Sequence, residues 1–184
     1  MIFKKYLRLE GKHAFLSASK HHWVGYDESK LVATFSSWLA AQRGTELHAF
    51  ACKAIELGVA LPPINQALNN YVNDGILYKM ETEQTLWYSD NCFGTADTIS
   101  FTDGLLRIHD LKTGTTKASL TQLEIYAALF CLDYNHRPDE IGIELRLYQA
   151  DSVLIYNPEP SDILRIMDKI IFFDKRIEEL KAGG

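Results

Sequence analysis

The spacing of hydrophobic and polar residues divides the chain into predicted helices and strands. Apolar residues recur at helical spacing in four segments, residues 28–58, 62–75, 119–134 and 160–181. Apolar and polar residues alternate, as in strands, in four further segments, residues 76–89, 93–101, 105–113 and 140–158. The last of these segments is expected to fold back on itself. The first helix is either continuous or broken near Gly44, and Gly75 is a plausible end for the second.

This order of elements predicts an α/β domain with a central mixed, largely antiparallel sheet flanked by helices. The length of 184 residues suits one domain over residues 1–184. Since no apolar run approaches about 18 residues, we expect no membrane span. The first residues lack the apolar stretch of a signal peptide, so we expect a cytoplasmic protein.

Charge and cysteine content narrow the class of protein only slightly. The net charge is −5, but residues 1–22 carry five Lys or Arg and one Glu, so the rest of the chain is more acidic still. A basic face on an acidic body suits contact with a phosphate backbone, although a solvated surface explains the charges equally well. The three cysteines have no paired spacing, so we expect reduced thiols and no iron–sulfur cluster.

The dipeptide Asp103–Gly104 separates two alternating apolar runs and predicts a two-residue hairpin. With that turn, paired residues are fixed along both strands, and apolar residues meet apolar residues near the turn. The same register places Asp97 opposite Asp110. Lys112 follows on the same face as Asp110, because side chains alternate along a strand.

Two acids at opposed positions require a compensating charge when they are partly buried. Their Cβ atoms are expected about 4.5–5.5 Å apart, and two carboxylates at that separation repel and lose hydration. A divalent cation would supply the charge, and oxygen ligands favour Mg²⁺ or Mn²⁺, as one or two ions. The alternative is an exposed sheet face on which Asp110 and Lys112 form an incidental pair.

Four other polar residues interrupt apolar elements near this pair. His48 is either a metal ligand or a core histidine, and Glu83 is either a third oxygen ligand or a solvent-facing strand residue. Gln122 and Tyr126 share one helix face, from which they contact a phosphate, orient a ligand or only border the helix.

The basic N-terminal segment offers candidates for contact with a nucleic-acid backbone. Ser17 and Ser19 are short donors beside Lys20, although helix capping is an alternative role for the serines. Lys117, which follows the third predicted strand, is a further candidate. DNA is therefore the expected partner, and a homo-oligomer or a recombination partner protein remains compatible with the sequence.

Five short motifs in this order resemble the PD-(D/E)xK nuclease superfamily, specifically its RecB-like branch with CRISPR-associated and phage relatives. They are LSASK, RGTELH, GTAD, HDLKTG and QLEIY, between residues 16 and 126. The resemblance implies a restriction-endonuclease-like core and a stand-alone nuclease, in which Asp97 and Asp110 hold the metal. It implies that His48 is a further ligand, that Lys112 is the catalytic lysine and that Gln122 with Tyr126 form the trailing motif. Unlike many relatives, the chain lacks four cysteines for an iron–sulfur cluster and has no helicase region.

The leading hypothesis is a Mg²⁺- or Mn²⁺-dependent DNA nuclease, an exonuclease in recombination or end processing. A structure-specific endonuclease is the alternative within enzymes. A catalytically silent DNA-binding or assembly subunit on the same fold is the alternative from another class.

Overall fold

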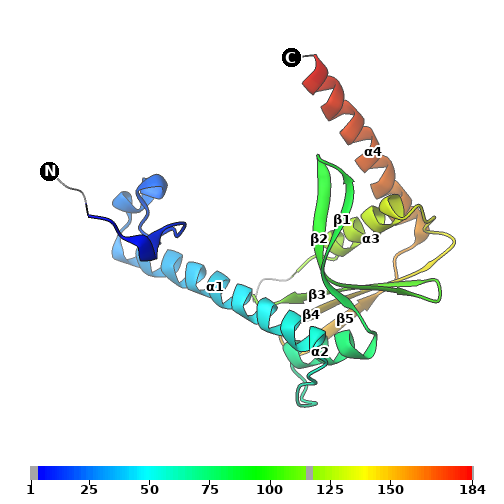
Figure 1. Ribbon diagram of the computed structural model, residues 1–184, viewed down its shortest axis with the longest axis horizontal. Helices are drawn as coiled ribbons and strands as arrows, with labels where there is room; N and C mark the ends of the chain where they lie inside the picture. Colours follow the sequence, from blue (N-terminus) through cyan, green and yellow to red (C-terminus); the bar gives the residue numbers. More distant parts are fainter. Residues whose placement is uncertain (1–3, 115–117, 184) are drawn as a thin grey trace. The chain divides into compact units, whose positions relative to one another are not determined.

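The computed structural model describes residues 4–114 and 118–183, which form two compact units (Figure 1). The N-terminal unit is Met1–Thr45 and the sheet unit is Glu46–Gly184. The N-terminal unit contains the short helices η1 (Leu7–Leu9) and η2 (Ala18–Gly25) and the first part of α1 (Glu28–Glu56). The prediction of one domain over the whole chain stays a prediction.

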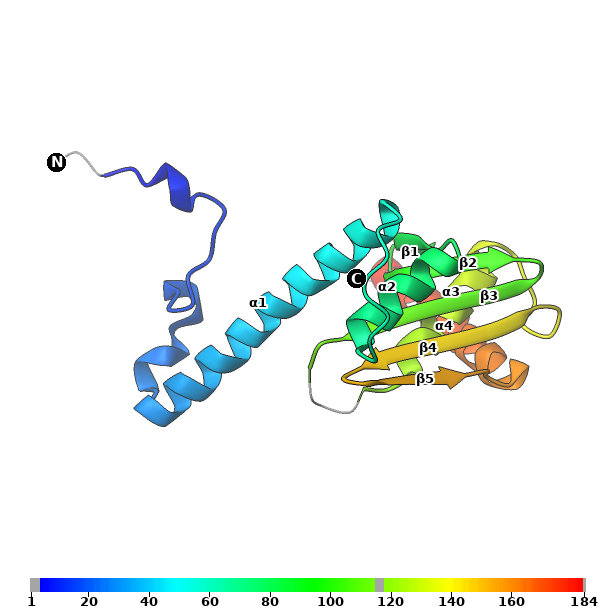
Figure 2. The same cartoon turned by 90° about the horizontal axis from the view of Figure 1, so that it is seen from below.

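The sheet unit is a five-stranded mixed sheet flanked by helices, which confirms the predicted fold class. Its strands are β1 (Glu81–Ser89), β2 (Cys92–Thr102), β3 (Leu105–Lys112), β4 (Gly142–Gln149) and β5 (Ser152–Tyr156). They lie side by side in chain order, and only β3 and β4 are parallel (Figure 2). The remaining helices are α2 (Ala67–Leu77), α3 (Thr121–Asp133) and α4 (Pro160–Ala182).

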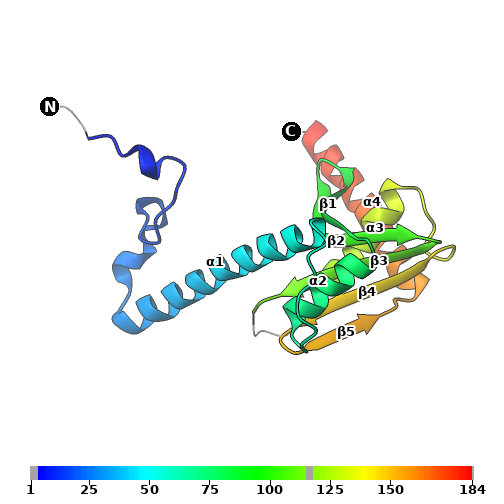
Figure 3. The same ribbon diagram turned by 60° about the horizontal axis from the view of Figure 1, so that its bottom comes forward.

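Two apolar clusters, one on each face, hold helices against this sheet. On one face, α3 and α4 pack against β1 to β4, with buried Leu106 and Ile108 facing Leu123 and Ala127. On the other face, α2 and the last turns of α1 pack against the ends of β3 and β4 (Figure 3). The alternation of side chains along β3 therefore sends successive residues into different layers.

The predicted helices form, but the predictions at two glycines need comment. Gly44 does not break the first helix, because α1 is continuous from Glu28 to Glu56. The expected stop at Gly75 is wrong, since α2 begins at Ala67 and continues to Leu77. A Cβ at Gly75 would lie 2.7 Å from Cδ1 of Ile55, so this glycine permits close helix contact. No helix in the two described ranges is both long and apolar enough to cross a membrane.

The hairpin between β2 and β3 has the predicted turn and register. Asp103 and Gly104 both have positive φ, +52° and +74°, as a two-residue turn of this kind requires. Thr102 pairs with Leu105, and the ladder continues in this register to Thr98 and His109. The next step along the same register places Asp97 opposite Asp110.

Candidate active site

Asp97 lies where the pairing of β2 with both neighbouring strands is interrupted. The ladder with β1 skips from Thr98 to Ala96, and the ladder with β3 ends at Thr98. By these registers Asp97 faces Glu83 on one side and Asp110 on the other. Three adjacent strands thus place an acid at the same level of the sheet, as the hairpin prediction required for two of them.

Asp110 is buried and is paired with Lys112, two residues further along β3. Nζ of Lys112 lies 2.9 Å from Oδ1 of Asp110, whose side chain is 3% exposed. Oδ2 of Asp110 is buried and has no hydrogen-bond partner in the structure. Burial is the main cause that raises the pKa of Asp110; the hydrogen bond from Lys112 opposes this rise and the charge of Asp97 adds to it. A buried carboxylate oxygen without a partner is a position at which a cation or a proton is favoured.

Lys112 connects the strand to two polar residues of α3. Its Nζ donates to Oε1 of Gln122 at 3.0 Å, and Nε2 of Gln122 donates to the hydroxyl of Tyr126 at 3.0 Å. A Cβ at Gly94 on β2 would lie 2.9 Å from Cε1 of Tyr126, so the glycine makes room for this ring. The predicted trailing pair therefore orients the lysine and does more than border the helix.

His48 reaches the same acids from α1. Its Nδ1 lies 3.3 Å from Oδ2 of Asp97, and the hydrogen bond between them raises the pKa of His48 above its ordinary value. The same Oδ2 accepts a hydrogen bond from the backbone N–H of Leu111 at 3.4 Å. The side chain of His48 is 27% exposed, so it lies at the rim of the core and beside the acids, as a ligand or a charge partner would.

Glu83 is held in an unusual backbone conformation at the level of Asp97. Its φ is +51°, a left-handed value that costs a residue with a side chain about 1–3 kcal/mol. Its Oε1 lies 3.5 Å from the Sγ of Cys52, which donates to it. Burial, followed by the charge of Glu83, raises the pKa of Cys52 to about 12, so this thiol stays protonated and is a donor to the carboxylate.

Lys112 and His48 lie beside the two opposed acids, for which the sequence predicted a compensating cation. Within residues 4–114 and 118–183, no three His, Cys, Asp or Glu side chains are grouped as a ready metal site. Each acid of the opposed pair has a basic partner instead, at 2.9 Å for Asp110 and 3.3 Å for Asp97. A bound cation would have to compete with these pairs.

The candidates for nucleic-acid contact at positions 17, 19 and 20 belong to the N-terminal unit, and the two serines are hydrogen-bonded to each other. Oγ of Ser17 and Oγ of Ser19 are 2.8 Å apart, and Ser17 precedes η2 without a side-chain capping bond. The capping alternative is therefore not observed. Lys20 lines a cavity described below. Lys117 lies outside the described residues.

Three contributors to the site were missed by the sequence analysis. They are the thiol of Cys52, the backbone N–H of Leu111 and the glycine at position 94. Two of them had a readable signal, because Cys52 follows His48 by four residues and so shares its helix face, and Gly94 opens the GTAD motif.

Scans of protein-family models, curated proteins and solved structures found no match to this chain. What the site does is therefore inferred from the residues that form it.

Proposed function

We propose that the chain is a metal-dependent DNA nuclease of the PD-(D/E)xK superfamily, of its RecB-like branch, and an exonuclease in recombination or end processing. One observation carries the proposal. A buried carboxylate, a half-buried lysine and a helix glutamine are linked by contacts of 2.9 and 3.0 Å beside a second strand acid. Such an arrangement places a positive charge and hydrogen-bond donors where a phosphodiester can meet them.

The residues divide into those that hold a cation and those that act on the substrate. Asp97 and Asp110 offer hard oxygen donors, and the unpartnered Oδ2 of Asp110 suits this role. His48 and Glu83 stand beside them as further ligands. When bound, Mg²⁺ or Mn²⁺ polarises the phosphate and acidifies water.

Lys112 is the residue proposed to act on the reacting groups. Its side chain is 32% exposed, so it reaches solvent while its ammonium stays bonded to Asp110. In that position it neutralises charge that develops on the phosphate or positions the attacking water. Gln122 and Tyr126 limit its freedom, which keeps the ammonium in place during the reaction.

One observation favours a second candidate, a catalytically silent DNA-binding subunit. Within the described residues one oxygen of each opposed acid lies beside a basic side chain, and no three His, Cys, Asp or Glu side chains are grouped as a ready metal site. A protein that had lost its metal would be stable in this arrangement. Retention of both acids together with Lys112 is the argument for the enzyme.

The two candidates are separated by digestion of end-labelled linear DNA and closed circular DNA in Mn²⁺. An exonuclease degrades the linear DNA and leaves the circle intact, whereas an endonuclease also cuts the circle. We expect loss of linear DNA only, and Asp110→Ala should abolish it. Binding of DNA without cleavage of either substrate at any Mn²⁺ concentration would establish the silent subunit instead.

Calorimetric titration with Mn²⁺ tests the metal site apart from cleavage. Asp97→Ala and Asp110→Ala should bind Mn²⁺ much more weakly than the unmodified chain. Asp168→Ala is the matched control, because Asp168 is an exposed acid on α4. Equal affinity in all four proteins would exclude Asp97 and Asp110 as ligands.

A further inference from the structure

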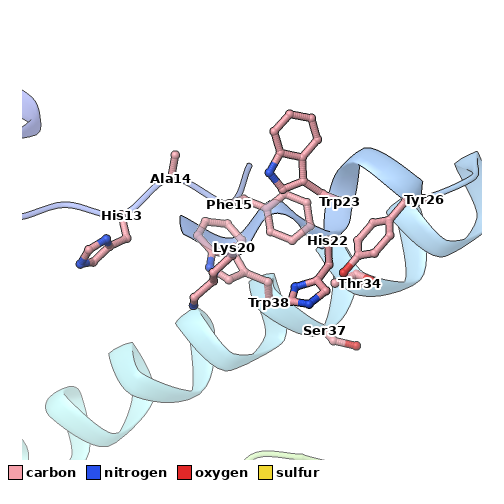
Figure 4. Close-up of a pocket in the computed structure, with 10 residues that line it drawn as sticks. All are labelled: His13, Ala14, Phe15, Lys20, His22, Trp23, Tyr26, Thr34, Ser37 and Trp38. Carbon is pink, nitrogen blue, oxygen red and sulfur yellow. The ribbon is translucent and has the colours of Figure 1, made fainter. Parts of the chain in front are cut away.

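The N-terminal unit contains a cavity of about 480 Å³ that the proposed nuclease site does not explain (Figure 4). Its lining combines aromatic rings with basic and hydroxyl side chains, among them Phe15, Lys20, His22, Trp23, Tyr26 and Trp38. In Figure 4 these side chains come from α1 and from the segment before it.

The aromatic part of this wall is a cluster of rings around Phe15. The centroid of Phe15 lies 5.1 Å from that of Phe35 and 5.7 Å from that of Trp38. Phe35 and Trp38 are stacked at 5.5 Å, yet they remain 43% and 38% exposed. Large rings that pack together and still face solvent offer an apolar flat surface to a ligand.

Hydrogen bonding fixes the second tryptophan of the cavity. Nε1 of Trp23 donates to the carbonyl oxygen of Ser17 at 2.9 Å, so the polar edge of the indole is satisfied within the unit. The ring of Trp23 then presents only apolar carbon to the cavity. The LSASK segment thus contributes to the wall through the carbonyl of Ser17 as well as through Lys20.

The charge of the unit is opposite to that of the rest of the chain. Residues 1–45 hold seven Lys or Arg and three Asp or Glu, whereas the whole chain has a net charge of −5. Lys20 and His22 lie in the cavity lining itself, and Nζ of Lys30 lies 5.3 Å from the ring centre of Tyr26. An apolar protein segment would have to desolvate the ammonium of Lys20, whereas a polyanion would pair with it.

We propose that this cavity binds an unpaired nucleotide of a single-stranded nucleic acid. The base stacks on the rings of Trp38 and Phe15, and its phosphate lies beside Lys20. A base within a duplex is already stacked and cannot enter, so the cavity selects frayed or single-stranded ends. The inference deepens the proposed function and rests on it, since it names the form of nucleic acid that the chain holds.

The three tryptophans of the chain make the test direct. Trp87 lies on β1 and is 50% exposed, so Trp87→Phe should leave Trp23 and Trp38 as the only indoles, both in the cavity. The full chain with this substitution is titrated with short oligothymidylate in EDTA, and indole fluorescence is recorded. We expect saturable quenching, because stacking against a base quenches indole emission.

Matched ligands separate the base from the phosphate. An abasic oligomer of equal length and a blunt duplex should quench little, although both carry the same phosphates. Oligouridylate identifies the source of the strand, since tighter saturation by oligothymidylate assigns the ligand to DNA and the reverse assigns it to RNA. Equal quenching by the abasic oligomer, or no saturable quenching by any single strand, would overturn the proposal.

Two variants in the Trp87→Phe background test the wall and the charge separately. Trp38→Leu should weaken oligothymidylate binding at least about 5-fold, with Trp23 as the remaining reporter. Lys20→Ala should leave the preference for oligothymidylate over the abasic oligomer intact and reduce the salt dependence of binding. Circular dichroism verifies that both variants retain their helices, and unchanged affinity in a folded Trp38→Leu variant would contradict the stacking role.

Because EDTA prevents cleavage, the test is independent of the nuclease activity. Cleavage of DNA without quenching would end this inference and leave the proposed function standing. Quenching without cleavage of any DNA would retain the cavity as a binding site and end the nuclease proposal.

Discussion

His109 and Asp110 are neighbours on β3, both are buried, and they belong to polar networks of different character. His109 points to the face covered by α2, where its Nδ1 lies 3.2 Å from the hydroxyl of Tyr148. That hydroxyl donates to Oδ2 of Asp74 at 2.6 Å, and Arg146 also donates to Asp74 at 2.8 Å. Asp110 points to the face covered by α3 and is bonded to a lysine that is partly exposed.

The two networks differ in how far solvent reaches them and in which basic side chain each contains, Arg146 or Lys112. Burial, followed by the charges of Arg146 and Arg107, lowers the pKa of His109 to about 3, so this imidazole is neutral at ordinary pH. Arg146 is a permanently charged group that is 12% exposed, whereas Lys112 is 32% exposed and carries a compact ammonium. A closed network with an arginine stabilises the fold, and an open one with a lysine remains available for chemistry. Three substitutions test this contrast, beginning with the largest expected effect.

Replacement of Lys112 by alanine should lower DNA cleavage at least about 100-fold at saturating Mn²⁺, as expected for loss of one positioned donor. Mn²⁺ binding should stay near normal or tighten slightly, since a positive charge beside the cation is removed. Lys112→Arg should not restore the rate, because a planar guanidinium does not replace a point charge. Single-turnover cleavage assays measure the effect.

Lys175→Ala is the matched control, because Lys175 is an exposed lysine on α4. It should cleave DNA at the unmodified rate. A rate for Lys112→Ala close to that of this control would remove the lysine from the chemistry and return support to the silent subunit.

Replacement of His48 by alanine should lower cleavage about 10- to 100-fold at limiting Mn²⁺, with recovery as Mn²⁺ is raised. The physical reason is that a ligand beside Asp97 is lost while the acids remain. Cleavage is measured across a Mn²⁺ series, and Lys53→Ala, an exposed position further along α1, is the control. A fall in melting temperature with no recovery at high Mn²⁺ would show that His48 serves the core.

Replacement of Tyr148 by phenylalanine should reduce the free energy of unfolding by about 1–3 kcal/mol and leave cleavage unchanged. The ring is retained, but Asp74 loses one donor and His109 loses the hydroxyl beside its Nδ1. Urea unfolding measures the change. Tyr134→Phe, at a tyrosine that is 51% exposed, should have almost no effect. A loss of cleavage in a stable Tyr148→Phe protein would break the proposed separation of the two networks.

Much of the sheet was predictable because its signals are local. The Asp103–Gly104 turn determines which residues of β2 and β3 face each other, and the pairs that this turn requires, Thr102–Leu105, Phe101–Leu106 and Ile99–Ile108, are observed. The position of Asp97 opposite Asp110 follows from that register alone. The stop at Gly75 was wrong because the same residue type serves turns and close helix contacts, and only the neighbour, Ile55, distinguishes them.

The candidate site was predictable as a set of residues and not as a set of contacts. The order of motifs selected His48, Asp97, Asp110, Lys112, Gln122 and Tyr126, and contacts of 2.9–3.3 Å link His48 to Asp97 and the other four to one another. It did not indicate that Nδ1 of His48 would lie 3.3 Å from Asp97 itself, or that Gln122 would accept a hydrogen bond from Lys112. Those pairs form between elements that are distant along the chain, so their geometry depends on how the helices pack.

By itself the sequence determined the periods of the elements, the hairpin register and therefore the level at which the two acids meet, since each depends on residues close together in the chain. The tertiary structure alone decided that Asp97 meets His48, that Cys52 faces Glu83, and which face of β3 is closed. The reason is that burial against α1, α2 and α3 sets these contacts, and burial results from the two apolar clusters acting together.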